Sequence, residues 1–176
     1  GTRANPVVGP GPREHSPPAQ TPGTVIYAPK KPPGFLGFDF PVVGPGPLRQ
    51  LFNIALSNMG ARQVIGIDLL PSRLAHSQKH GATATICNAE VDPVEAVSEL
   101  TGGRMVDVVI EVVGHADQAI NLCISLACHA GRMLYFGVPP ETIDGVRWRD
   151  LFMKNLTVHT SVNPDFDRDF PLAMRW

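Results

Sequence analysis

A strand–turn–helix–strand pattern in residues 42–68 constrains the fold more than any other part of the sequence. The stretch reads VVGPGPLRQLFNIALSNMGARQVIGID, an apolar strand, a glycine turn, an amphipathic helix, a second strand and a terminal acid. Gly44 and Gly46 allow a tight turn and let backbone N–H groups approach a pyrophosphate at the N-terminus of the helix. Asp68 ends the second strand, where a carboxylate can accept both hydroxyls of a ribose. The pattern predicts a βαβ unit that binds a dinucleotide.

The helix of this unit is predicted to have one apolar side. Apolar residues at helical spacing form a stripe that packs on a sheet, and here they are Leu48, Leu51, Phe52, Ala55, Leu56 and Met59. Gly60 is expected to end the helix.

Arg49 departs from the glycine fingerprint of such units. The G-x-G-x-x-G pattern has a third glycine where helix and strand pack closest, and this chain has G-P-G-P-L-R. We expect a large cation at this point to push the helix outward and weaken nucleotide binding. Recognition of a phosphate by Arg49 is the alternative hypothesis.

Strands and helices alternate from residue 41 onward. The nearly continuous apolar, β-branched run 106–113 is typical of a strand buried on both faces of a parallel sheet. Glu111 in this run needs a partner or a raised pKa, and we expect a structural hydrogen bond rather than catalysis. The further expected strands are 64–68, 83–88, 132–137 and 156–162. Two further helices are expected to begin at 71 and 92, and two more to span 115–129 and 148–154.

Six strands joined by crossover helices predict an α/β fold, a doubly wound parallel sheet of order 3-2-1-4-5-6. This is a Rossmann fold, which binds its ligand at the carboxyl ends of the strands. Residues 1–40 are rich in proline and lack periodicity, so they are expected to form an irregular or disordered leader. The predicted Rossmann domain is 41–176, truncated at its C-terminal helix.

Bulk properties exclude several partners. A net charge of −1 gives no electrostatic reason to expect nucleic acid or an anionic membrane. The sequence has neither an apolar run of about 18 residues nor a signal peptide, so a cytoplasmic protein is expected. Cys87, Cys123 and Cys128 lie in apolar segments and are predicted to be reduced, buried thiols rather than metal ligands.

Together these landmarks resemble the cofactor-binding domain of the zinc-type medium-chain dehydrogenases, which include alcohol, sorbitol and threonine dehydrogenases. The resemblance covers about residues 41–176, and its motifs are VVGPGPL, VIGIDLLPSRL, the EVVG of 111–114 and the GRMLYFGVPP of 131–140. It implies that Gly46, Pro47 and Leu48 face the pyrophosphate. It places Asp68 at the adenosine ribose, with Arg73 beside it. Val113 and Gly114 would border the nicotinamide ribose, and Phe136, Gly137 and Val138 the carboxamide.

The resemblance also implies a cofactor, an activity and a partner. An acid at position 68 favours NAD over NADP, because a 2′-phosphate would meet a like charge. The implied reaction is hydride transfer between NAD and an alcohol, polyol or ketone. Zinc is expected in the full-length family enzyme and not in this chain. Residues 142–148 are expected to pair with their twin in a homodimer.

The family's zinc site and substrate cleft lie mainly in a domain that precedes the cofactor domain. Residues 1–40 offer only His15 as a candidate ligand. Nothing evident would then polarise a substrate oxygen, so we assign no catalytic residue and expect the isolated chain to be inactive. Two alternatives stay open. One is an S-adenosylmethionine-dependent methyltransferase, whose sheet would end in a reversed hairpin, and the other is a non-catalytic binding or dimerising remnant in which Arg49 abolishes the nucleotide site.

Overall fold

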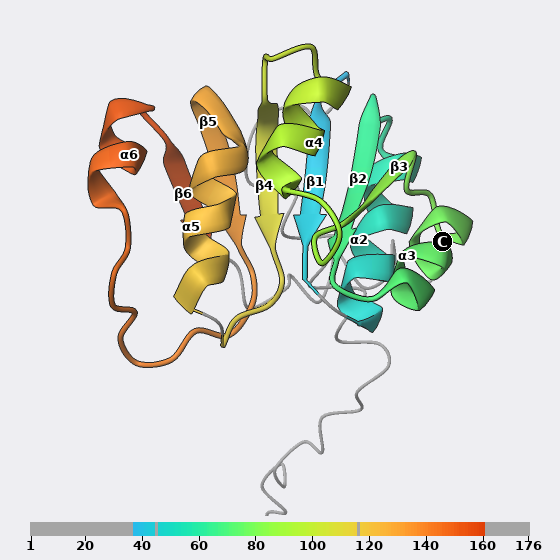
Figure 1. Ribbon diagram of the computed structural model, residues 1–176, viewed down its shortest axis with the longest axis horizontal. Coiled ribbons are helices and arrows are strands. Elements are labelled where there is room, and N and C mark those ends of the chain that lie inside the picture. The colour runs from blue at the N-terminus through green and yellow to red at the C-terminus, as the bar shows by residue number, and fades with distance from the viewer. Residues whose placement is uncertain (1–36, 45, 116, 161–176) are drawn as a thin grey trace, which may run out of the picture.

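All six strands of the computed structural model run parallel in one sheet, in the order β3-β2-β1-β4-β5-β6 (Figure 1). The structure describes residues 37–44, 46–115 and 117–160, and only the backbone of Asp117. The strands are β1 Asp39–Val43, β2 Gln63–Asp68, β3 Ala84–Cys87, β4 Val106–Glu111, β5 Ala127–Tyr135 and β6 Thr157–Thr160. The helices are α2 Pro47–Asn58, α3 Pro71–Lys79, α4 Pro93–Leu100, α5 Asp117–Leu126 and α6 Trp148–Met153. The predicted order and the Rossmann fold are confirmed.

Alternate residues of the central strands face two separate cores. Val42 of β1 packs with Phe52 and Leu56 of α2 on one face of the sheet. Val43 packs on the other face, in the cluster that contains Val97 of α4 and Ile124 of α5. In Figure 1 α4 and α5 lie in front of the strands. Helices therefore cover both faces of the sheet, as strands that are apolar on both sides require.

The predicted apolar stripe of α2 is confirmed. Phe52, Ala55 and Leu56 are buried against the sheet. Leu48, Leu51 and Met59 are partly buried around them. Burying this stripe holds α2, and with it the glycine turn before its first residue, in a fixed place on the sheet.

The registers of three neighbouring strands bring their carboxyl ends to one edge. Val43, the last residue of β1, pairs with Ile67 on one side and with Glu111 on the other. Asp68 follows Ile67 directly. The loops after β1, β2 and β4 therefore leave the sheet side by side, at the edge where ligands of doubly wound folds bind.

The boundary between α5 and β5 differs from the prediction. A helix was expected to reach residue 129 and the next strand to span 132–137, but α5 ends at Leu126 and β5 runs from Ala127 to Tyr135. The Nζ of Lys154 donates hydrogen bonds of 2.9 Å to the carbonyls of Ile124, Ser125 and Ala127. These bonds satisfy the last carbonyls of the helix, while Ala127 pairs with Val106 of β4. Both partners are distant in the sequence, so local periodicity does not reveal them.

Other boundaries shift by a few residues. β1 begins at Asp39 instead of residue 42, and β4 ends at Glu111 instead of residue 113. The helix expected to begin at 92 is confirmed, and Asp92 caps it, because its carboxylate accepts the N–H groups of Val94 and Glu95. The leader up to residue 36 and the truncated C-terminal helix of the prediction lie outside the described residues. In the described part of the chain, the helices are too short or too polar to cross a bilayer.

Candidate functional site

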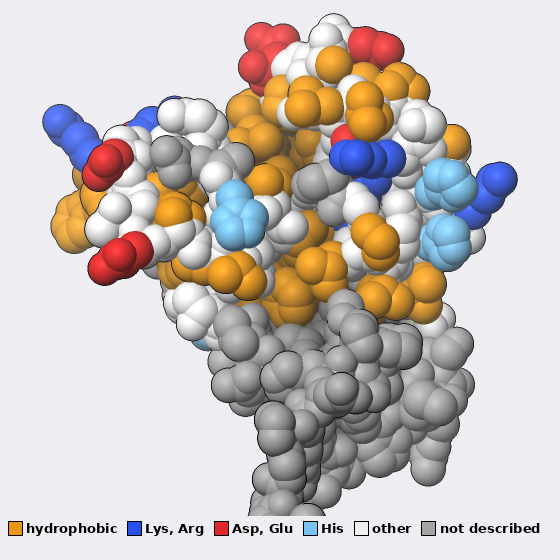
Figure 2. All heavy atoms as spheres, turned by 90° about the horizontal axis from the view of Figure 1, so that it is seen from below, with side chains coloured by type: hydrophobic (Ala, Val, Ile, Leu, Met, Phe, Trp, Pro, Cys, Tyr) orange, Lys and Arg blue, Asp and Glu red, His pale blue; other side chains and the backbone are white. Residues whose placement is uncertain are grey.

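A crevice of about 420 Å³ opens at the carboxyl ends of β1, β2 and β4. Its walls include Gly44, Asp68, Arg73 and Val113, four residues that the sequence assigned to a cofactor. Most of the lining is apolar, and Figure 2, which views the molecule from this edge, shows hydrophobic side chains across the middle of the face. A crevice with apolar walls and a few polar groups at its rim is typical of a small-molecule site.

The glycine turn is shaped by close packing on one side and open space on the other. A Cβ on Gly44 would lie 2.8 Å from the side chain of Val112, and its φ of 137° is one that residues with a side chain rarely adopt. Around Gly46, by contrast, an added Cβ would meet none of the described residues within 4 Å. Gly46 is the N-cap of α2, so the described residues leave space beside it at the N-terminus of this helix, where a pyrophosphate could bind.

A second cavity of about 470 Å³ lies beside the first turns of α2. It is lined by Gly46, Pro47, His76 and Arg73, among others. Arg73 therefore lines both cavities and joins the predicted pyrophosphate position to the predicted ribose position. Leu48, the third residue assigned to the pyrophosphate, is partly buried, and its side chain packs against the core under α2.

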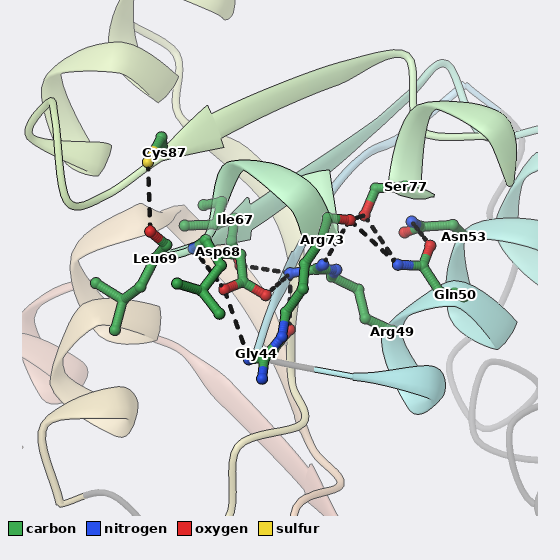
Figure 3. A network of polar contacts seen from close by, with 11 residues as sticks. Gly44, Arg49, Gln50, Asn53, Ile67, Asp68, Leu69, Arg73, Ser77 and Cys87 are labelled. Carbon is green, nitrogen blue, oxygen red and sulfur yellow. Dashed lines mark hydrogen bonds and ion pairs between the residues drawn. The ribbon is translucent and has the colours of Figure 1, made fainter. Parts of the chain in front are cut away.

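Arg49 is fully buried and its guanidinium points at Asp68 (Figure 3). Its Nη1 lies 2.5 Å from Oδ2 of Asp68 and also donates to the carbonyls of Gly44 at 2.9 Å and Ile67 at 3.2 Å. Its Nη2 donates to the carbonyl of Arg73 at 3.1 Å. The expected outward displacement of α2 is wrong, since the side chain fits under the turn while Phe52 and Leu56 stay fully buried. Its full burial and its bonds to protein groups also leave no terminal nitrogen placed for the alternative, direct contact with a phosphate, while the expected weakening of nucleotide binding stays a prediction.

The carboxylate of Asp68 bonds to the chain's own donors. Its Oδ2 accepts Arg49, and its Oδ1 accepts the N–H of Leu70 at 3.0 Å and lies 3.9 Å from Nη1 of Arg73. The Asp68 side chain is 3% exposed, whereas that of Arg73 is 45% exposed. Asp68 thus stands at the predicted place in the crevice wall, but paired with two arginines.

The five residues assigned to the nicotinamide end are brought together by β4 and β5. The Oε1 of Glu111 accepts the N–H groups of Val113 at 2.7 Å and Gly114 at 2.9 Å. The Glu111 carbonyl accepts the N–H groups of Phe136 and Gly137. The hydrogen-bonding role predicted for Glu111 is confirmed, and this one residue holds both loops.

Only some of these five residues present a side chain to solvent. Phe136 turns inward, where its ring meets that of Phe52 edge to face with 5.0 Å between centroids. Val138 is 64% exposed. Gly114 lies so close to the loop after β5 that a Cβ on it would be 2.6 Å from the carbonyl oxygen of Val138. Contact of Phe136 with a cofactor would therefore run through its backbone.

Burial raises the pKa of Glu111 above its usual value, and the N–H groups of Gly114 and Val113 oppose this shift. The folded protein then holds a proton on Glu111 at a pH where the unfolded chain has lost it. This contribution to stability is fully present below the unfolded pKa and is lost as the pH rises through the folded pKa.

Replacing Glu111 with glutamine should remove this pH dependence. The free energy of unfolding of Glu111→Gln, relative to the natural chain, should increase as the pH rises above about 4.5, by at most about 1.4 kcal/mol per pH unit. Urea unfolding followed by circular dichroism between pH 4 and 8 measures the difference. Glu99→Gln, at an exposed position of α4, controls for the substitution itself. A difference that does not change with pH, or that falls as the pH rises, would contradict the assignment.

The structure adds crevice residues that the sequence did not single out. Asn88 and Gln118 both line the crevice, and Oδ1 of Asn88 is buried without a hydrogen-bond partner among the described residues. A polar residue that directly follows a strand at the carboxyl edge was the available signal for Asn88. Gln118 lies in the first turn of α5, and its sequence context gives no comparable signal.

The described residues contain no group of three or more His, Cys, Asp or Glu side chains that could hold a metal ion. The three cysteines are free thiols. Cys123 is fully buried as predicted, but Cys87 and Cys128 are only half-buried. The position of His15, the one candidate ligand in the leader, lies outside the described residues.

Comparison with known proteins identifies the family. The family model described as zinc-binding dehydrogenase matches residues 51–176. The chain is 33% identical over 117 residues to an L-threonine 3-dehydrogenase of Bacillus velezensis, which covers 66% of this chain and 33% of that protein. It is 37% identical over 105 residues to the L-threonine 3-dehydrogenase of Bacillus subtilis, covering 58% and 30% respectively. The chain thus spans about a third of the length of these relatives.

Solved structures share the fold. An alcohol dehydrogenase zinc-binding domain protein from Burkholderia ambifaria matches with a TM-score of 0.71 at 29% identity, over 82% of this chain and 38% of that one. A putative zinc-binding dehydrogenase from Sinorhizobium meliloti, bound to NADP, matches with a TM-score of 0.80 at 23% identity, over 89% and 47%. With the family model covering well over half of its residues, the chain belongs to the zinc-binding dehydrogenase family.

Proposed function

We propose that residues 41–176 form the dinucleotide-binding domain of a zinc-type dehydrogenase and bind a nicotinamide–adenine dinucleotide in the crevice. The observation that carries the proposal is the crevice itself, which joins Gly44, Asp68, Arg73 and Val113 at the carboxyl ends of adjacent strands. These residues come from separate segments and were assigned to one ligand on sequence grounds. The parallel pairing of β6 with β5 disfavours the methyltransferase alternative, which requires a reversed hairpin at this place.

The proposed ligand would extend along this edge of the sheet. Gly46, Pro47 and Leu48 are proposed to hold the pyrophosphate at the N-terminus of α2, where the helix dipole and free N–H groups favour an anion. Asp68 and Arg73 are proposed to flank the adenosine ribose. The nicotinamide would lie near the two loops held by Glu111, with Val113 and Gly114 on one loop and 136–138 on the other.

The bound dinucleotide would supply or accept the hydride in a reaction with an alcohol, polyol or ketone. This chain's own contribution is to bind and orient the cofactor and to exclude water with the apolar crevice walls. As the family resemblance places the zinc and the substrate groups in a separate domain, we expect the isolated chain to bind the dinucleotide without turning over an alcohol.

Titration of the purified chain with NADH, NADPH and S-adenosylmethionine tests the proposal. Saturable binding of at least one dinucleotide, measured by nicotinamide fluorescence or calorimetry, is expected, with no saturable signal from S-adenosylmethionine. Gly46→Asp, which places an anion at the N-terminus of α2, should weaken dinucleotide binding at least about tenfold. Circular dichroism of the variant establishes that it is folded. Absence of saturable binding by both dinucleotides would overturn the proposal and favour the non-catalytic remnant.

We further propose that residues 142–148 and the adjoining α6 form a contact between two copies of this chain. Asn121 of α5 fixes the segment, because its amide donates to the Gly145 carbonyl at 3.0 Å and accepts the Arg147 N–H at 2.9 Å. Beside it, Trp148 and Phe152 are 66% and 76% exposed. Large apolar side chains held on a rigid segment favour burial against a partner.

The double substitution Trp148→Ser and Phe152→Ser should convert a dimer into a monomer. Light scattering after gel filtration, over a range of protein concentrations, should give twice the mass of one chain for the natural sequence and the mass of one chain for the variant. Leu69→Ser, which removes an exposed leucine after β2, is the matched control and should leave the mass unchanged. A natural chain that is monomeric at every concentration would contradict this proposal.

A further inference from the structure

We propose that Arg49 controls the choice between NAD(H) and NADP(H), because it neutralises Asp68 and so lets the site accept a 2′-phosphate on the adenosine ribose. This inference rests on the proposed function. It assigns a role to the residue that departs from the glycine fingerprint, and it modifies the preference for NAD that the acid at position 68 predicts.

The charges around the ribose position support this role. An acid at the end of the second strand discriminates against NADP because its negative charge repels the 2′-phosphate. In this chain the same carboxylate lies 2.5 Å from Arg49 and 3.9 Å from Arg73. Arg49 and Arg73 together carry two positive charges and Asp68 carries one negative charge, so the net charge of these three side chains favours an anion.

The hydrogen bonds of Asp68 point in the same direction. NAD gains affinity when a free carboxylate accepts the ribose hydroxyls. Here Oδ2 already accepts Arg49 and Oδ1 already accepts the N–H of Leu70. The side chain is also almost fully buried, so fewer of its acceptor positions remain for a ribose. The advantage that the acid normally gives to NAD is therefore reduced.

Arg49 acts through Asp68 and not by contact with the phosphate. It is fully buried, and its two terminal nitrogens donate to three backbone carbonyls as well as to Asp68. Arg73 is the cation placed to meet a phosphate directly, since it is half-exposed and lines the crevice. Arg49 is thus a positioning residue that sets the charge of the site, and Arg73 supplies the exposed contact.

The ratio of dissociation constants for NADPH and NADH tests the inference, measured by fluorescence titration at one fixed ionic strength. The natural chain should bind NADPH at least as tightly as NADH. Arg49→Gly, which restores the glycine fingerprint, should shift the ratio toward NADH by about tenfold or more, because it frees the charge of Asp68. Arg49→Met, which keeps side-chain volume in the buried space, should shift the ratio in the same direction. Lys79→Met removes an exposed cation at the far end of α3 and should leave the ratio unchanged.

The outcomes separate the two levels of the proposal. If neither dinucleotide binds the natural chain, the proposed function fails. If both dinucleotides bind, the proposed function stands and two results would overturn the role of Arg49. One is a natural chain that prefers NADH by more than about tenfold. The other is a ratio that, in both folded Arg49 variants, stays within about twofold of the ratio in the natural chain. Circular dichroism identifies a variant that has not folded. In that case the NADPH-to-NADH ratios of the other variant and of the natural chain decide whether Arg49 has the proposed role.

Discussion

Replacing Asp68 with alanine is expected to lower the free energy of unfolding by about 3–5 kcal/mol, because the change leaves a buried guanidinium without its counter-charge. Arg49 is 0% exposed and Asp68 is 3% exposed, so neither charge is solvated by bulk water. The carbonyls of Gly44, Ile67 and Arg73 would still accept hydrogen bonds from Arg49, but they are neutral. Urea unfolding at pH 7 measures this loss, and the slope of the unfolding free energy against urea concentration should be the same in the variant and the natural chain.

The double variant Arg49→Met with Asp68→Ala provides the matched control. Removing both charges together should recover most of the lost stability, since the cost of Asp68→Ala comes from the uncompensated arginine. Arg73→Ala should change stability by no more than about 0.5 kcal/mol, because its guanidinium is half-exposed and 3.9 Å from the carboxylate. A loss below about 1 kcal/mol for Asp68→Ala, or no recovery in the double variant, would show that the pair does not compensate two buried charges.

The sheet order and the placement of the glycine turn could be predicted because they depend on local patterns. The central strands are short apolar runs, α3 begins at Pro71 and α4 directly follows its cap Asp92, and right-handed crossovers leave few possible orders. The predicted ends of β1, β2 and β4 therefore converge, and Gly44, Asp68 and Val113 line one crevice. No long-range contact had to be known to reach this result.

Arg49 and the end of α5 could not be predicted because their partners are distant in the sequence. Arg49 fits under the turn only because carbonyls from three segments, at Gly44, Ile67 and Arg73, converge on its guanidinium. The glycine fingerprint indicates how closely the helix and the strand pack at this position. It does not indicate which polar groups surround a side chain placed between them. In the same way α5 ends where Lys154, from the loop after α6, reaches its last carbonyls.

Replacing Gly137 with alanine should destabilise the protein by about 3 kcal/mol, the second largest loss we expect, because the new methyl group would overlap the loop after β4. Its Cβ would lie 2.5 Å from Cα of Gly114 and 2.7 Å from Oε2 of Glu111. Gly114 cannot easily retreat, since Glu111 holds its N–H and the Tyr135 hydroxyl donates to its carbonyl at 3.2 Å. The change must therefore separate the two loops proposed to border the nicotinamide. Thermal and urea unfolding measure the loss.

Gly102→Ala is the matched control for Gly137→Ala. Gly102 has a φ of 61°, a backbone conformation that residues with a side chain rarely adopt, but a Cβ there would meet none of the described residues within 4 Å, whereas the strain at Gly137 comes from contact alone. The loss for Gly102→Ala should be about 1–2 kcal/mol, from backbone strain alone. If both variants fold, only Gly137→Ala should also weaken dinucleotide binding, because only it displaces Gly114. Equal losses of stability for the two variants would mean that the loops can part at little cost, and that Glu111 does not hold them together.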